Sequence, residues 1–191
     1  YDFAQDISYS SVVSKELLLI TSKSEDYELI ISKIKSDDFE LFSINEEIIK
    51  SISGHIGNLQ VIVDDEGEDV TLNVSQIVWF DAKQMGLDQS GTFDPNLSSV
   101  DDVIQTLKEN INSYSYKKFT TYDKSICQYD GRREVICSKC EEVCPTVAIT
   151  KDDKTKTLTF SQIDCHGCGG CISVCPSGAL EYAPMNRESI Y

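Results

Sequence analysis

The residues whose type and spacing can do chemistry are eight cysteines, all between positions 127 and 175 of a chain of 191 residues. They form two copies of one pattern, in which two cysteines separated by two residues are followed by a third cysteine and a proline. Thiolates at this spacing are typical metal ligands, because one short loop brings several sulfur atoms to one centre. The repeat predicts a duplicated metal-binding unit. Its members are Cys137, Cys140, Cys144 and Pro145 in the first copy, and Cys168, Cys171, Cys175 and Pro176 in the second.

Each copy also has a leading cysteine, and the two copies differ there. Cys165 directly precedes the second copy, whereas the spacer Gln128–Ile136 separates Cys127 from the first. A looped-out spacer can still return Cys127 to the same centre, because lengthening a surface loop costs little free energy. The spacer contains Arg132 and Arg133. We hypothesise that their positive charge favours the reduced state of a negatively charged centre.

The second copy reads C-x2-C-x2-C-x3-C-P, the run by which bacterial ferredoxins hold [4Fe-4S] clusters. Glycines at positions 167, 169 and 170 let this loop bend sharply and approach a cluster closely. Residues 122–183 resemble a bacterial two-[4Fe-4S] ferredoxin domain. The resemblance implies two [4Fe-4S] clusters with crossed ligands, one held by Cys127, Cys137, Cys140 and Cys175, and the other by Cys165, Cys168, Cys171 and Cys144. If Cys127 does not bind, the first of these sites has three cysteines and can hold a [3Fe-4S] cluster.

The same resemblance implies the βαββαβ ferredoxin fold, with both clusters between its helices and its sheet. More widely, the chain resembles the N-terminal part of larger multi-cluster ferredoxin-like proteins of bacteria. That likeness rests on Gly91–Pro95, a helix, and then Cys127–Arg133 before the first C-x2-C. The strands expected around the two copies are Lys118–Ser125, Thr146–Thr150, Thr157–Ile163 and Ala179–Ala183.

The region before the repeat alternates between strand and helix patterns, and residues 81–98 are expected to form a long loop. The chain is therefore expected to be an α+β protein. A small α/β domain would cover residues 1–117, and a ferredoxin-type βαββαβ two-cluster domain residues 118–191. The expected strands are Glu16–Thr21, Phe39–Phe42, Leu59–Val63 and Val70–Phe80, and the expected helices are Ser24–Lys35, Glu46–Ser51 capped by Asn45, and Ser99–Asn112.

This first region carries no catalytic signature. The turn after Ile20 reads Thr-Ser-Lys-Ser, which matches neither of the glycine-rich phosphate loops. Ser53–Gly57 predicts a plain turn around His55, and the acidic run Asp64–Asp69 predicts a solvated hairpin tip rather than a cation site. Trp79 is expected in the core.

Disulfides and zinc are the alternatives to iron–sulfur clusters. Disulfides fit poorly, because C-x2-C pairs are too close for most bridges and are typical of metal sites. Zinc is the better rival, since two C-x2-C pairs also match zinc-ribbon spacing. Against zinc, the second run combines four cysteines and a proline at the ferredoxin spacing. His166 lies inside that run and is expected to be a surface residue or a modest tuner of potential rather than a ligand.

The chain has 32 acidic and 17 basic residues, and its formal net charge is −15. Residues 1–122 hold 22 acidic and 9 basic residues, whereas residues 123–191 hold 10 and 8. The acidic excess argues against a nucleic-acid surface, which needs clustered Lys and Arg, and favours redox partners with basic docking surfaces. No apolar run approaches the roughly 20 residues of a membrane-spanning helix. We expect a cytoplasmic protein.

These features favour an electron carrier over a stand-alone enzyme, and no catalytic residue is assigned. Clusters whose irons are all capped by cysteine have no open site for a substrate, so they pass single electrons. The alternative is a cluster-bearing component of a larger oxidoreductase, whose N-terminal domain binds a nucleotide, a flavin or a partner subunit. A third hypothesis is a non-redox assembly protein with structural clusters.

Overall fold

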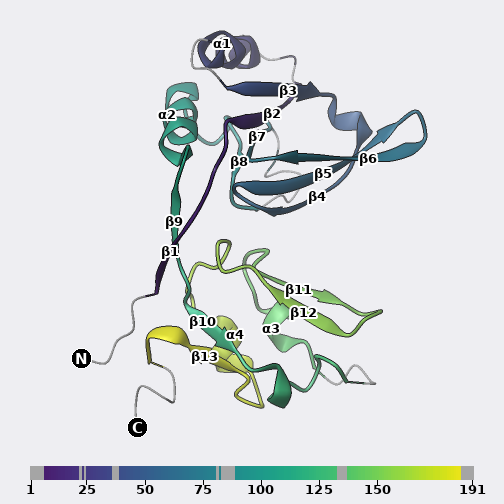
Figure 1. Ribbon diagram of the computed structural model, residues 1–191, viewed down its shortest axis with the longest axis vertical. Helices are drawn as coiled ribbons and strands as arrows, with labels where there is room; N and C mark the ends of the chain where they lie inside the picture. Colours follow the sequence, from purple (N-terminus) through teal and green to yellow (C-terminus); the bar gives the residue numbers. More distant parts are fainter. Residues whose placement is uncertain are drawn as a thin grey trace. The chain divides into compact units, whose positions relative to one another are not determined.

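The computed structural model describes residues 7–21, 23, 25–35, 39–80, 82, 89–132 and 137–185, and it is a mixed helix-and-strand protein (Figure 1). Residues 10–114 form one compact unit, and residues 1–9 with 115–191 form the other. Strands β1 (Ser8–Ser11) and β9 (Tyr114–Lys117) pair in a two-stranded sheet where the chain passes between the units. Among the described residues, no helix is long and apolar enough to cross a membrane.

A four-stranded parallel sheet forms the centre of the first unit. Its strand order is β3-β2-β7-β8, and each neighbouring pair is parallel. The central strand β2 is apolar over four consecutive residues because both of its faces are covered. The strands are β2 (Glu16–Ile20), β3 (Glu40–Ile44), β7 (Gln76–Val78) and β8 (Thr92–Phe93).

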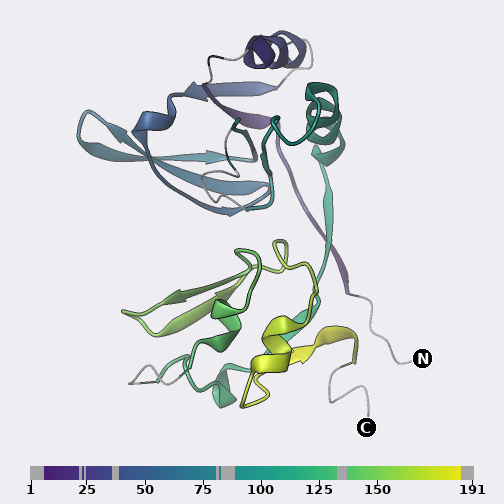
Figure 2. The same ribbon diagram turned by 180° about the vertical axis from the view of Figure 1, so that it is seen from behind.

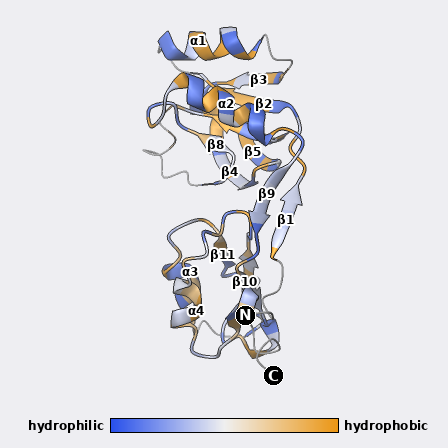
Figure 3. Ribbon diagram, turned by 90° about the vertical axis from the view of Figure 1, so that its left-hand side faces the viewer, coloured by the Kyte–Doolittle hydropathy of each residue, from blue (hydrophilic) through white to orange (hydrophobic). Residues whose placement is uncertain are grey.

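Helices α1 (Glu25–Ile34) and α2 (Val100–Asn110) cover one face of this sheet. Hydrophilic and hydrophobic residues alternate along α1 in Figure 3, as the helical period requires when only one side faces the sheet. Ser99 caps α2, because its hydroxyl accepts a hydrogen bond from the Asp102 backbone N–H at 3.2 Å. The expected cap of α1, Ser24, lies outside the described residues.

An antiparallel sheet of β4 (Ile49–His55), β5 (Asn58–Asp65) and β6 (Glu68–Val74) covers the other face (Figure 2). The predicted helix Glu46–Ser51 is wrong: a 3-10 turn at Glu46–Ile48 leads directly into β4. The predicted strand Val70–Phe80 is two strands, since β6 and β7 belong to different sheets. Trp79 lies in the core between the two sheets and is 4% exposed.

The second unit contains the cysteines, and its two strand pairs are both antiparallel. β10 (Thr120–Tyr122) pairs with β13 (Leu180–Tyr182), and β11 (Ile149–Asp152) pairs with β12 (Thr157–Phe160). Short helices α3 (Lys139–Glu142) and α4 (Gly170–Val174) follow β10 and β12 in the chain. All four strands are shorter than the stretches expected from the sequence.

The core of this second unit includes cysteine side chains. Cys127 and Cys140 are buried together with Tyr129, Ile149 and Leu158. Apolar residues alone therefore do not fill this core. Small domains with limited apolar cores commonly depend on bound metal for stability.

Candidate metal centres

The first candidate centre is a cavity lined by four cysteines that lie far apart in the sequence. Cys127 follows a 3-10 turn at Lys124–Ile126, and Cys137 and Cys140 lie before and within α3. The fourth is Cys175, which ends α4 in the other copy of the repeat. Both apolar residues, Leu158 among them, and polar residues complete the wall.

The second candidate centre repeats this arrangement. Cys165, Cys168 and Cys171 line a second cavity, and Cys144 joins them from the end of the first copy. Phe160 and Ile149 supply apolar wall. The eight cysteines are thus brought together as two sets of four, each with one member from the other copy. None of the eight forms a disulfide.

Glycines shape the loop around the second cavity. Gly167 and Gly169 both have positive φ, 69° and 74°, in the left-handed region that glycine adopts without strain. A Cβ atom at Gly167 would lie 2.7 Å from the ring of Phe119, whereas one at Gly169 would meet nothing within 4 Å. Both positions need glycine for backbone conformation, and Gly167 needs it for space as well.

The four thiols of each set line one cavity. Within the part of the chain that the structure describes, no three His, Cys, Asp or Glu side chains are placed to hold a single metal ion. A zinc site needs its sulfurs about 2.3 Å from one ion. A multi-iron cluster instead takes each thiolate on a different iron, so a cavity walled by four cysteines fits a [4Fe-4S] cluster.

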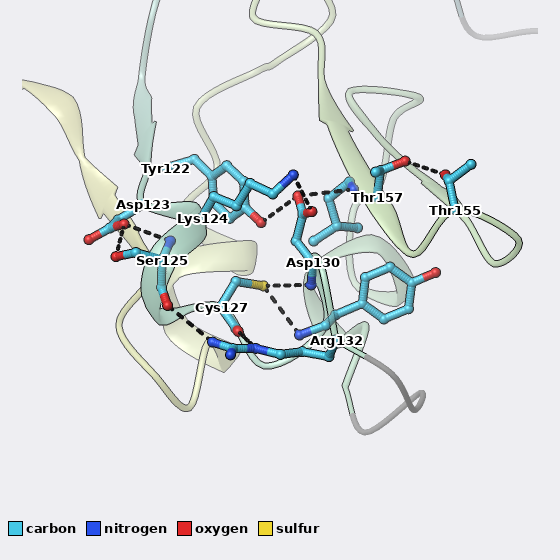
Figure 4. A network of polar contacts seen from close by, with 11 residues as sticks. Tyr122, Asp123, Lys124, Ser125, Cys127, Asp130, Arg132, Thr155 and Thr157 are labelled. Carbon is cyan, nitrogen blue, oxygen red and sulfur yellow. Dashed lines mark hydrogen bonds and ion pairs between the residues drawn. The ribbon is translucent and has the colours of Figure 1, made fainter.

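Backbone donors hold the Cys127 sulfur in place (Figure 4). The N–H groups of Tyr129 and Asp130 each donate a hydrogen bond of 3.4 Å to Cys127 Sγ. Arg132 Nε donates to the Cys127 carbonyl at 2.8 Å, and its guanidinium also donates to the Ser125 carbonyl at 3.0 Å. The start of the spacer therefore folds back onto Cys127. Arg133 lies outside the described residues.

Tyr129 and Asp130 also tie the spacer to the rest of the unit. The Tyr129 hydroxyl donates to Asp153 Oδ1 at 2.7 Å. Asp130 accepts from the Tyr122 hydroxyl at 2.9 Å and pairs with Lys124 at 2.9 Å. Burial opposes ionisation of Asp130, but Lys124 and Tyr122 keep its pKa below the usual value. The sequence alone singled out neither Tyr129 nor Asp130, since their roles depend on partners distant in the chain.

The thiols differ in their electrostatic surroundings. Burial raises the pKa of Cys140 to about 11, and burial also raises the pKa values of Cys165 and Cys171. Burial acts in the same direction on Cys175, but hydrogen bonds from the Ser177 hydroxyl and nearby backbone N–H groups bring its pKa below the usual value. Metal ligation requires thiolates, so binding at these sites releases protons.

The two cavities also differ in exposure. Cys168 is exposed, whereas Cys127 and Cys140 are buried. His166 lines the second cavity and is itself exposed, which agrees with its prediction as a surface residue. At Cys168, the wall of the second cavity is therefore more exposed to solvent than the wall of the first cavity is at Cys127 and Cys140.

Comparison with known proteins decides the class of this second unit. Residues 135–179 match the 4Fe-4S dicluster domain. The chain is also 40% identical over 58 residues to the polyferredoxin protein MvhB of Methanothermus fervidus. It is 33% identical over 51 residues to the polyferredoxin-like subunit of an aliphatic sulfonate oxidoreductase of Pyrococcus furiosus.

Each of these alignments covers 27% of this chain, and they cover 14% and 29% of the relatives. The chain thus spans less than a third of the length of either relative. It contains a 4Fe-4S ferredoxin-like domain, and this domain supports an iron–sulfur electron-transfer role.

Proposed function

We propose that this protein carries two [4Fe-4S] clusters and passes single electrons between redox partners. Cys127, Cys137, Cys140 and Cys175 would hold one cluster. Cys144, Cys165, Cys168 and Cys171 would hold the other. The cysteine-containing unit would then be a ferredoxin-type βαββαβ domain, which its element order of β10, α3, β11, β12, α4 and β13 supports.

One observation carries the proposal: two runs of cysteines sort into two cavities with an exchange of one cysteine each. Two zinc loops that each bind their own ion do not require a cysteine from the other loop. In two-cluster ferredoxins, by contrast, the last cysteine of each run binds the other cluster.

The cluster would supply reversible one-electron chemistry when bound. The chain's own residues set its surroundings. Buried apolar side chains such as Leu158 limit water around the first cluster, and backbone N–H groups donate to the Cys127 sulfur. Hydrogen bonds to sulfur, burial and nearby charge are the factors that set cluster potentials.

Anaerobic iron and sulfide analysis with EPR of the reduced protein tests the cluster content. Two four-iron clusters give about eight irons and about eight sulfides per chain, with interacting EPR signals. Stoichiometric zinc, or about four irons, would overturn the proposal.

The exchange of cysteines has its own test in four single Cys-to-Ser variants. If the ligands cross, Cys144→Ser and Cys168→Ser alter the same EPR signal, and Cys137→Ser and Cys175→Ser alter the other. Cys144→Ser grouping with Cys137→Ser would show that each run holds its own cluster.

A second candidate function is a cluster-bearing component of a larger oxidoreductase. The printed name of the Pyrococcus furiosus relative, a polyferredoxin-like subunit of an oxidoreductase, favours it. Both relatives are named as polyferredoxin or polyferredoxin-like proteins, which favours a chain that works within a multi-cluster assembly. Docking on basic partner surfaces, which the net charge of −15 favours, belongs to the same proposal, and so does a location in the cytoplasm. Reduction of the clusters by a candidate partner should then slow as salt is added.

A further inference from the structure

The first unit holds a cavity of about 550 Å3 at the carboxyl ends of its parallel strands. Thr21 follows β2, Asn45 follows β3 and Trp79 follows β7, and all three line it. Cavities that bind small molecules measure roughly 300–1,000 Å3. The remaining lining residues are Lys23, Glu46, Glu47 and Phe80.

The cavity lies where the connections of adjacent strands diverge. After β2 the chain passes to α1, which packs on one face of the sheet. After β7 it passes to the other face, where Ala82 joins the core against β4–β6 and the Gln89 side chain donates to the Ile52 carbonyl at 3.2 Å. In open α/β sheets, ligands bind in the crevice that such a divergence opens at the carboxyl ends of the strands.

The lining residues are rich in hydrogen-bond acceptors. Glu46 and Glu47 follow the second parallel strand and are exposed toward solvent. The Trp79 indole N–H donates to Glu46 Oε2 at 3.4 Å, which fixes that carboxylate beside the cavity. A carboxylate after the second strand of a dinucleotide-binding unit accepts hydrogen bonds from ribose hydroxyls. A ligand with adjacent hydroxyl groups suits this wall.

The same surroundings disfavour a diphosphate. The turn after β2 has no glycine-rich loop to cradle a pyrophosphate. The first turn of α1 carries Glu25, Asp26 and Glu28, which repel anions from that helix end. Lys23 is the one cation among the residues described around the cavity. A ligand with at most one phosphate group is therefore preferred.

We infer that this cavity binds a nucleoside or nucleoside monophosphate through its ribose hydroxyls. Glu46 and Glu47 accept hydrogen bonds from the two hydroxyls, and Lys23 takes the phosphate where one is present. The site belongs to the first unit alone, so it does not depend on the cluster ligands.

Anaerobic calorimetric titration of the full chain with adenosine, AMP and 2′,3′-dideoxyadenosine tests the inference. Adenosine and AMP should bind, and the dideoxy compound should bind at least about tenfold more weakly because it lacks both donors. Trp79 is the only tryptophan, so a change in its emission would place the ligand beside Glu46. Tighter binding of AMP than of adenosine, lost in Lys23→Gln, would identify the phosphate contact.

Glu46→Gln should weaken adenosine binding by about tenfold, since an amide replaces an acceptor carboxylate. Glu40→Gln is the matched control, because Glu40 is an exposed acid at the opposite end of β3, and it should change nothing. Equal binding of adenosine and its dideoxy analogue, or no binding of adenosine and AMP at millimolar concentration, would overturn the inference. The iron content of every variant should stay that of the parent chain, so a failure here is separate from a failure of the cluster proposal.

Discussion

Cys127 is held in place by the residues that directly follow it in the chain. No helix holds it, and its sulfur is positioned by two backbone N–H groups of the spacer, each 3.4 Å away. Those donors exist because the spacer turns back immediately after Cys127 and is anchored by buried Tyr129. The extra residues that made Cys127 doubtful as a ligand are thus the residues that hold it.

Replacing Cys127 by serine should convert the first centre from four thiolates to three. We expect loss of about one iron per chain and the appearance of a [3Fe-4S] EPR signal, while the second cluster keeps its signal. Iron analysis measures the loss, EPR of oxidised samples detects the [3Fe-4S] signal, and EPR of reduced samples detects the signal of the second cluster. An unchanged count of about eight irons would remove Cys127 from the ligand set.

Gly167 and Gly169 offer a matched pair, because both have positive φ but only one lacks space. Gly169→Ala should cost about 1 kcal/mol of stability from backbone conformation alone. Gly167→Ala should cost roughly 1–3 kcal/mol more, because its Cβ would meet the ring of Phe119. Anaerobic denaturant unfolding compares the two variants, and equal losses would contradict the close approach to Phe119.

At the scale of elements, the sequence could predict those whose pattern is local. The apolar run in β2 and the periodic helix α2 were found where expected, within a few residues. The break between β6 and β7 could not be predicted from the sequence, because the pattern of Val70–Phe80 is continuously strand-like. Only the pairing of Gln76 and Val78 with β2 shows that β7 is a separate strand. The cavity in the first unit was missed for the same reason: its residues meet only through parallel strand pairing.

The eight cysteines could be singled out by their spacing, and the family resemblance divided them into two sets. The structure places the members of each set along one cavity. Their role as cluster ligands stays a prediction. The fold at the start of the spacer, around Tyr129 and Asp130, was not predictable, since it depends on Asp153 and Leu158 in the hairpin of β11 and β12.

The hairpin of β5 and β6 carries a charge cluster with a defined response to pH. Hydrogen bonds from Lys50 and from the Gly67 backbone N–H keep the pKa of Asp64 below its usual value. The stability that Asp64 contributes is therefore complete above the pKa of the unfolded chain and is lost as the pH falls through the lower folded value. At neutral pH the full contribution is present.

Lys50→Gln should raise the pKa of Asp64 toward its usual value, because its main hydrogen-bond donor is lost. Some depression should persist, since the Gly67 N–H still donates at 2.9 Å. Carboxyl carbon NMR titration of Asp64 measures the change. Lys33→Gln is the control, because Lys33 pairs with Asp101 instead and should leave the Asp64 titration where it was.

At the scale of the whole molecule, the two units owe their stability to different sources. The first has two apolar clusters on either face of the sheet, rich in Leu, Ile and Val. The second has a core in which Cys127 and Cys140 are buried beside a few apolar residues. Burial of apolar surface stabilises the first unit, whereas under the proposed function the second would also depend on what its cysteines bind.

Removing iron should therefore unfold one unit and spare the other. After treatment with an oxidant and a chelator, we expect hydrogen exchange at β10, α3 and β13 to rise to the rates of unfolded chain, because cysteines that would hold the clusters lie in the core of this unit. Exchange at β2 and β7 should stay slow, since Leu17, Leu18 and Ile77 remain buried without iron. Mass spectrometry of peptic fragments resolves these segments. Re-adding iron and sulfide under argon is the control and should restore protection in the second unit. Protection of β10 and β13 that survives complete removal of iron would show that their apolar contacts are sufficient alone.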